Sequence, residues 1–164
     1  MAHSSDRPLA LLLSIKPRFA SAIMSGEKRV EFRRGPYRGD VKAVLVYATS
    51  PVQRLIGYFE IAFVEESSPT ALWRKYRRVG GIEYGDYRRY YAGTQRAVAI
   101  GVGKVHRLAK EPPLSRLGPG TVPPQSFRYV PMTVLEELRS PEAEVPPSLA
   151  RRHPNVERPV RGWT

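Results

Sequence analysis

The chain has 164 residues, of which 41% are hydrophobic and 26% are charged, and this composition predicts one globular domain. Lysine and arginine number 27 against 15 for aspartate and glutamate, so the formal net charge is +12. A charge of this sign favours a polyanionic partner, and RNA or DNA is the simplest candidate. The alternative is a generally basic surface that has no nucleic-acid partner.

The residue inventory excludes some classes of site. The sequence contains no cysteine, which excludes disulfides and thiolate metal sites. The three histidines, His3, His106 and His153, are far apart in the sequence, so we expect no metal and no cofactor. The apolar run 9–15 is too short to span a bilayer and lacks a signal-peptide cleavage pattern. We therefore expect a cytoplasmic protein without a membrane partner, and the oligomeric state is left open.

The first half of the chain predicts strands around one short helix. Pro17 suits the first turn of that helix and Gly26 suits its end. The predicted strands of this half are 9–15, 28–34, 41–47 and 55–64. In the last of them, strict alternation places Leu55 and Phe59 on one face.

The second half predicts two helices, a long strand, and a final strand and helix. Ser68 is suited to cap a helix whose first residue is Pro69. The later predicted elements are a helix over 84–92, strands over 94–108 and 127–130, and a helix over 132–139. Parallel crossovers are not regularly spaced, so we expect an α+β fold, a small mixed or antiparallel β-barrel with peripheral short helices.

Both ends of the chain lack a periodic pattern. Residues 1–8 are polar and are expected to be disordered. From 140 to 164 the sequence is rich in proline and charge, which predicts a C-terminal tail. The folded domain is therefore expected over residues 9–139.

Charged side chains gather around the first predicted helix and the strand after it. These residues are Lys16, Lys28, Arg29, Glu31, Arg33 and Arg34. The cations can hold phosphate oxygens, and Glu31 can orient a cation or accept a base N–H. The competing interpretation is a solvated strand with one surface salt bridge worth about 0–1 kcal/mol. On spacing alone, the solvated strand is the preferred interpretation.

The same segment resembles the ASCH family, whose members have a PUA-like barrel. The family pattern GxKxxExR is present as Gly26, Lys28, Glu31 and Arg33. Three ordered segments resemble a prokaryotic ASCH subgroup described as predicted transcriptional regulators: SIKP at 14–17, YATSP at 47–51 and PPQSF at 123–127. The resemblance covers about residues 9–139 and implies a cleft between the barrel and the first helix.

What the resemblance implies about activity is less specific. Related modules bind RNA or modified bases, so it implies a nucleic-acid ligand and a possible regulatory role. One ASCH branch hydrolyses acetylated cytidine with a Lys, a Thr three residues later and a Glu. Glu31 stands here at the Thr position, and a carboxylate does not replace that hydroxyl in the same mechanism, so a non-enzymatic role is preferred. Ribonuclease activity, also ascribed to ASCH proteins, would rest on Lys28, Glu31 and Tyr47.

Other candidate residues lie outside this segment. Tyr47 and Ser50 end a predicted strand, and Ser126 lies in the PPQSF segment. A second basic block over 74–91 interleaves cations with tyrosines, which suits phosphate and stacking contacts. Each candidate also has a competing interpretation: turn formation at the strand end, core packing in the PPQSF segment, and solvated helices in the basic block. The predicted interface comprises Lys16, Lys28, Glu31, Arg33, Arg34, Tyr47, Ser50, Arg74, Arg77, Arg78 and Ser126. The remaining alternative is a regulator that binds a small ligand or a protein.

Overall fold

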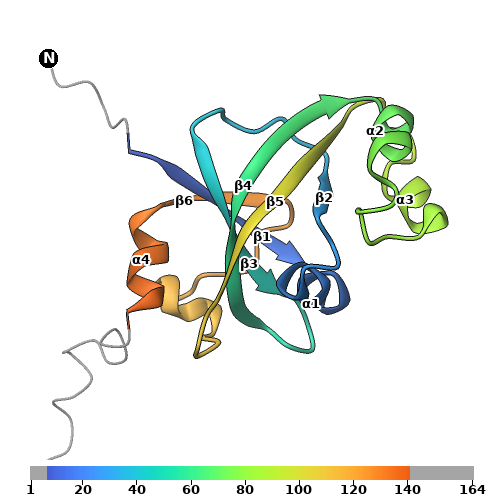
Figure 1. Cartoon of the computed structure of the whole chain (residues 1–164). Helices are drawn as coiled ribbons and strands as arrows, with labels where there is room; N and C mark the ends of the chain where they lie inside the picture. Colours follow the sequence, from blue (N-terminus) through green and yellow to red (C-terminus); the bar gives the residue numbers. More distant parts are fainter. Residues whose placement is uncertain (1–6, 141–164) are drawn as a thin grey trace, which may run out of the picture.

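A computed structural model describes residues 7–140, and a strongly twisted six-stranded sheet lies at its centre (Figure 1). The strands are β1 (Leu9–Ile15), β2 (Val30–Arg33), β3 (Val41–Ala48), β4 (Arg54–Ser67), β5 (Ala97–Arg107) and β6 (Phe127–Pro131). Their order across the sheet is β2-β5-β4-β3-β1-β6. The β1–β3 pair is parallel and the other neighbouring pairs are antiparallel. The expected α+β class with a mixed, barrel-like sheet is confirmed.

Short helices lie around this sheet. They are α1 (Pro17–Ser25), α2 (Pro69–Tyr76), α3 (Tyr84–Tyr90) and α4 (Thr133–Arg139), with a 3-10 turn at Leu114–Leu117. Gly26 ends α1 with a φ of 86°, in the left-handed region that glycine adopts without strain. The Ser68 side chain caps α2 by accepting from the Ala71 N–H at 3.2 Å. No helix among the described residues is long and apolar enough to cross a membrane.

Helices α2 and α3 form a lobe between β4 and β5, which we call the α2–α3 lobe (residues 68–96). Figure 1 shows this lobe beyond the ends of β4 and β5, at the opposite side of the molecule from α4. Its apolar side packs on β2 and β5 through Leu72, Tyr87 and Tyr91. The lobe therefore packs at the β2 edge of the sheet. Strand β2 carries Glu31 and Arg33 of the family pattern.

The sequence prediction for the faces of β4 is wrong. Leu55 packs in the cluster beneath α4, whereas Phe59 packs in the cluster beneath α1. The cause is a β-bulge: Val46 pairs with Gly57 and Tyr47 pairs with Leu55, so one extra residue of β4 lies between these pairs. One extra residue in a strand shifts the alternation of its side chains, so residues before and after it that would share a face lie on opposite faces.

The expected disordered N-terminus (1–8) and the expected tail (140–164) lie almost wholly outside the described residues.

Candidate functional site

A cleft of about 420 Å³ opens between the end of β1, α1, β2 and α3. Ser14 and Ile15 border it from β1, and Lys16, Arg18 and Phe19 border it from the start of α1. Strand β2 and Lys28, two residues before it, supply the floor, and α3 supplies the far wall. The structure thus has a cleft beside the first helix, as the resemblance implies, with α3 as a wall that the sequence did not indicate.

Three charged side chains form the floor of this cleft, and we call Lys28, Glu31 and Arg33 the charged cluster. Lys28 Nζ lies 3.4 Å from Glu31 Oε2, and Arg33 Nε donates to Glu31 Oε1 at 3.1 Å. Lys28 is only 2% exposed and Glu31 only 7%. Glu31 and Arg33 share a face of β2 because strand side chains alternate. The interpretation as a solvated strand is therefore wrong, because Lys28 and Glu31 are buried and all three charges are paired.

Hydrogen bonds to the backbone fix the charged cluster between three parts of the fold. Arg33 Nη2 donates to the carbonyl of Ser14 at 2.8 Å, and Lys28 Nζ donates to the carbonyl of Gly80. The first bond joins β2 to the end of β1, and the second joins it to the loop after α2. These anchors hold both cations in fixed positions, which is the preorganisation that a binding site needs.

Two glycines allow the loop after α2 to approach Lys28 closely. A Cβ atom on Gly80 would lie 2.4 Å from Cε2 of the Phe32 ring. Gly81 has a φ of 58°, and a Cβ there would lie 3.0 Å from Cβ of Lys28. A larger residue at either position would push the loop away, and with it the carbonyl that Lys28 contacts.

Burial lowers the pKa of Lys28, and the attraction of Glu31 opposes that shift. The Phe19 and Phe32 ring centroids lie 5.2 Å and 5.5 Å from Lys28 Nζ, within the range of cation–π attraction. Two cations share one carboxylate in this cluster, so one positive charge remains unbalanced at the cleft floor when all three are ionised. The arrangement favours an anion in the cleft.

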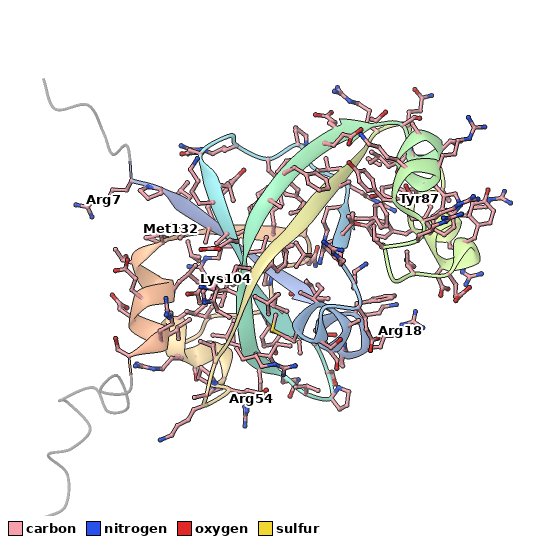
Figure 2. The ribbon with its side chains drawn as sticks, in the orientation of Figure 1. Arg7, Arg18, Arg54, Tyr87, Lys104 and Met132 are labelled. Carbon is pink, nitrogen blue, oxygen red and sulfur yellow. The ribbon has the colours of Figure 1, made fainter. Side chains whose placement is uncertain are left out.

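The rim of the cleft is built by an ion-pair bridge between α1 and α3. Arg18 Nη2 lies 3.3 Å from Asp86 Oδ2, and Arg89 pairs with the same carboxylate. Figure 2 shows Arg18 on the side of α1 that faces the α2–α3 lobe. Next to this bridge, the Arg34 guanidinium lies 4.9 Å from the Tyr90 ring centroid and donates to the Tyr90 carbonyl.

The structure brings together four of the predicted interface residues and leaves the others apart. Lys16, Lys28, Glu31 and Arg33 line the cleft. Arg34 is exposed and packs on Tyr90 beside it. Of the other cleft residues, Arg18 and Asp86 were missed, and Arg89 and Tyr90 were placed only in the second basic block. The alternation of cations and tyrosines over 84–91 indicated an outlying surface and not a cleft wall.

Tyr47 and Ser50 do not line the cleft. Tyr47 is 4% exposed and packs in the cluster beneath α4, because its position in β3 faces that side of the sheet. Ser50 is exposed in the turn after β3. The structure thus separates Tyr47 from Lys28 and Glu31, with which the sequence analysis grouped it as a possible catalytic residue.

The remaining predicted residues are exposed and lie outside the cleft lining. Arg74 lies on α2, and Arg77 and Arg78 follow it. Ser126 is exposed in the loop before β6. This loop is connected to the cleft border by the Ser14 hydroxyl, which donates to the Pro124 carbonyl at 2.8 Å.

Among the described residues, no three Asp, Glu or His side chains are grouped so that they could hold a metal ion.

Comparison with known proteins gives the family. Residues 13–106 match the ASCH domain. An ASCH domain-containing ribonuclease from Zymomonas mobilis is 37% identical over 101 residues, which are 61% of this chain and 68% of that protein. The large ribosomal subunit protein uL22 of Ureaplasma parvum is 31% identical over 121 residues, which are 73% of this chain and 39% of that protein. The chain therefore spans well under half of this ribosomal relative.

Solved structures agree with the sequence matches. The crystal structure of ASCH from Zymomonas mobilis has a TM-score of 0.69 and 29% identity, covering 77% of this chain and 91% of that chain. A tyrosine-to-phenylalanine variant of the Zymomonas protein has a TM-score of 0.71 and 28% identity, covering 79% and 95%. The family pattern at the cleft floor, the match over residues 13–106 and these structures together show that the chain belongs to the ASCH domain family.

Proposed function

We propose that the chain binds RNA and that the cleft between α1, β2 and α3 holds a nucleotide of the strand. The observation that carries this proposal is the charged cluster at the cleft floor, where the buried Lys28 and the part-buried Arg33 share one carboxylate. The net charge of +12 supports an anionic ligand. RNA is favoured because the Zymomonas relative is named a ribonuclease.

A purely structural role does not account for the charged cluster. Burying ions is expensive, and well-packed apolar side chains of similar volume often stabilise a protein as well or better. Buried ionisable groups with shifted pKa values that line a cleft are typical of functional sites. The cleft volume of about 420 Å³ also lies within the ~300–1,000 Å³ usual for small-ligand sites.

The cleft offers the three kinds of contact that a nucleotide needs. Lys16, Arg18 and Arg89 are exposed cations at its mouth and suit phosphate oxygens. The rings of Phe19 and Tyr90 line its walls and suit stacking of a base. At the floor, Arg33 suits an anionic oxygen.

The binding proposal can be tested by fluorescence polarisation with a labelled single-stranded RNA at low and high salt. We expect measurable affinity at low salt and a steep loss with added salt, because phosphate contacts release counterions. Lys16→Gln should reduce the salt dependence by the equivalent of about one phosphate contact. Lys42→Gln is the matched control, because Lys42 is exposed at the opposite end of the parallel β1–β3 pair.

Two results would overturn the proposal. One is the absence of affinity for RNA at low salt. The other is an equal effect of the Lys16 and Lys42 substitutions, which would indicate attraction by the overall charge and not by the cleft. A DNA strand of the same sequence, measured in parallel, shows whether the ribose hydroxyl contributes to affinity.

RNA cleavage is a second candidate function, favoured by the contact between a carboxylate and two cations in one cleft. In this reaction Glu31 would accept the proton of a ribose 2′-hydroxyl, and the 2′-oxygen would attack the adjacent phosphorus. Arg33 would stabilise the charge that develops on the phosphate oxygens. As the bond to the 5′-oxygen breaks, the leaving oxygen would take a proton from Lys28. The products are a 2′,3′-cyclic phosphate and a 5′-hydroxyl.

Cleavage is tested with an end-labelled RNA and with a strand of the same base sequence in which every sugar is 2′-deoxyribose. We expect cyclic-phosphate products from the first and none from the second, because only the ribose has the attacking oxygen. Activity that Glu31→Gln leaves unchanged would contradict this assignment, provided that the variant is folded by circular dichroism. Cleavage of the deoxy strand would contradict the mechanism itself.

A further inference from the structure

Resting on the proposed binding of RNA, we infer that the α2–α3 lobe carries a second site, which stacks a nucleobase of the same RNA strand. This site is a pocket of about 530 Å³ on the other face of α3 from the cleft. We call it the aromatic pocket, defined by Trp73, Tyr84, Tyr87, Tyr91 and Arg88. It takes in Tyr84, Tyr87, Arg88 and Tyr91 of the second basic block, which do not line the cleft.

The aromatic pocket is built from rings in mutual contact. The Trp73 ring centroid lies 5.0 Å from that of Tyr84 and 4.8 Å from that of Tyr87, which lies 4.8 Å from that of Tyr91. Tyr87 and Tyr91 are buried, whereas Tyr84 is 52% exposed. A large aromatic side chain that is half exposed beside a rigid aromatic floor is the geometry in which bases stack on proteins.

The floor of the pocket is held by hydrogen bonds, and one of them connects it to the cleft. The Tyr87 hydroxyl donates to the Pro69 carbonyl at 2.7 Å. The Tyr91 hydroxyl donates to the carbonyl of Arg33 at 2.8 Å. Because Arg33 belongs to the charged cluster, the same strand residue supports both sites.

Polar side chains at the edge of the pocket are available to a ligand. Thr70, Thr94 and Gln95 line it, and their side chains form no hydrogen bond with the residues that the structure describes. Hydroxyl and amide groups can both donate and accept, so they can pair with the edge of any base. Ser68 differs, because its hydroxyl already accepts from the Ala71 N–H.

Charge selects a nucleotide over the other ligands that aromatic pockets take. The α2–α3 lobe has seven Lys or Arg residues against two carboxylates. A cluster of rings in an acidic or neutral setting suits methylated ammonium groups, but this excess of positive charge repels them. The Arg88 guanidinium lies 5.9 Å from the Tyr84 ring centroid, where it can meet the phosphate of a stacked nucleotide.

Helix α3 separates the two sites and gives one strand a short path between them. Asp86, Arg89 and Tyr90 face the cleft, whereas Tyr87, Arg88 and Tyr91 face the aromatic pocket. A helix with its side chains is about 10–12 Å across. A single strand that leaves the cleft over α3 therefore reaches the aromatic pocket within a few nucleotides.

The intrinsic fluorescence of Trp73 tests this inference directly. The chain has two tryptophans, Trp73 and Trp163, so the Trp163→Phe variant leaves Trp73 as the single indole reporter. We would titrate this full-length variant with a dinucleotide, which can fill the cleft alone, and with an RNA decanucleotide, which can also reach the lobe. We expect the decanucleotide to quench Trp73 and to bind more tightly, and the dinucleotide to do neither.

Substitutions of Tyr84 separate stacking from other effects. Tyr84→Ala should weaken binding of the decanucleotide by about 5- to 150-fold, the range measured for the loss of one base–aromatic stack. It should leave dinucleotide binding unchanged, because Tyr84 does not line the cleft. Tyr84→Phe is the matched control and should bind the decanucleotide like the parent, because it keeps the ring.

The outcomes distinguish this inference from the proposed function. Equal affinity for both lengths, without quenching of Trp73, overturns the aromatic pocket and leaves RNA binding by the cleft intact. If neither length binds, the proposed function fails and the inference fails with it. Quenching by an acidic peptide and not by RNA would assign the pocket to a protein partner and overturn the inference. Circular dichroism of Tyr84→Ala checks that the lobe is folded.

Discussion

The two faces of α3 offer a ligand different kinds of contact, charged groups on one face and aromatic rings on the other. On one face, the cleft has charges that are buried, paired and bonded to backbone carbonyls. On the other face, the aromatic pocket has rings in tilted and edge contacts, and Arg88 beside them is exposed. The first arrangement depends on a few atoms in fixed places, whereas the second depends on a surface that many similar side chains could form.

The two sites also differ in how the chain assembles them. The cleft combines the end of β1, α1, β2 and α3, which lie far apart in the sequence. The aromatic pocket comes from residues 68–95 alone, an insert between the antiparallel neighbours β4 and β5. An insert of this kind can acquire or lose a binding surface without changing the order of the strands. We therefore expect substitutions in the cleft to affect both stability and binding, and substitution of the exposed Tyr84 of the pocket to affect mainly binding.

The largest expected effect follows from removing the shared carboxylate of the charged cluster. Glu31→Gln leaves the buried Lys28 and the part-buried Arg33 without an opposite charge, so the free energy of unfolding should fall by about 3–5 kcal/mol. Glu66→Gln is the matched control, because Glu66 pairs with the exposed Arg96 of the lobe, and it should change stability by about 0–1 kcal/mol. Urea denaturation measures both values. Similar small losses in the two variants would show that the cluster is hydrated and not buried.

The charged cluster was singled out by the family pattern, whereas spacing alone favoured a solvated strand. Lys28, Glu31 and Arg33 lie within six consecutive residues, and alternation along a strand places the last two on one face. The same locality explains the success with α1, where Pro17 and Gly26 mark both ends. Local patterns therefore sufficed for the two ends of α1 and for the shared face of Glu31 and Arg33, but not for the burial of the charged cluster.

What the sequence did not predict depends on how distant elements are placed. Asp86, Arg89 and Tyr90 become cleft residues only because the lobe folds back beside β2, and no pattern within 84–90 indicates that position. The β-bulge in β4, which separates Leu55 from Phe59, arises from pairing with β3 and leaves no mark in the alternation. Tyr47 shows the same limit, because the strand end was identified but not the face of its side chain.

The next effect concerns the loop that connects the lobe to the cleft floor. Gly80→Ala would place a methyl group against the Phe32 ring, so we expect a loss of stability of about 1–3 kcal/mol from overpacking. The loop should move away from Lys28, and RNA affinity should fall as well. Gly39→Ala is the matched control, because a Cβ atom there has no neighbour within 4 Å. Normal RNA affinity in a Gly80→Ala protein of reduced stability would show that the Gly80 carbonyl is not needed to hold Lys28 for binding.

The pH dependence of stability distinguishes a buried lysine of the cleft from an exposed one of the lobe. Burial lowers the pKa of Lys28 below its ordinary value of 10.5. The unfolded chain therefore binds more protons than the folded chain between these two pKa values, and stability should rise with pH through that window. Compared with Lys28→Met, the wild type should gain stability as the pH rises toward 10.5. Denaturation across this pH range measures the difference.

Lys75 provides the opposite case for the same measurement. Its hydrogen bond to Glu65 raises the pKa of Lys75, so its contribution should be complete below pH 10.5 and lost above it. The difference between the wild type and Lys75→Met should therefore stay level in the window where the Lys28 difference rises. If the stability differences for Lys28→Met and Lys75→Met changed with pH in the same way, Lys28 would be as well hydrated as Lys75.

The smallest expected effect is a gain of affinity, and it tests which face of α3 the first nucleotide contacts. Asp86 is the carboxylate of the cleft rim and occupies Arg18 and Arg89. Asp86→Asn removes a charge that repels phosphate and frees both cations, so affinity should rise by about 1.5- to 5-fold, the equivalent of one exposed ion pair. Asp40→Asn is the matched control, because it frees the exposed Arg38, which does not line the cleft. This substitution should change RNA affinity little.

The Asp86 result also separates the two faces of the helix, because oligonucleotide length should not matter to it. A residue that acts on the cleft should strengthen dinucleotide and decanucleotide binding by the same factor, whereas Tyr84→Ala should weaken only the longer strand. An Asp86→Asn gain confined to the decanucleotide would place the first nucleotide outside the cleft, on the pocket side of α3. A gain at both lengths that disappears at high salt would agree with a charge acting on phosphate, because exposed charges are screened.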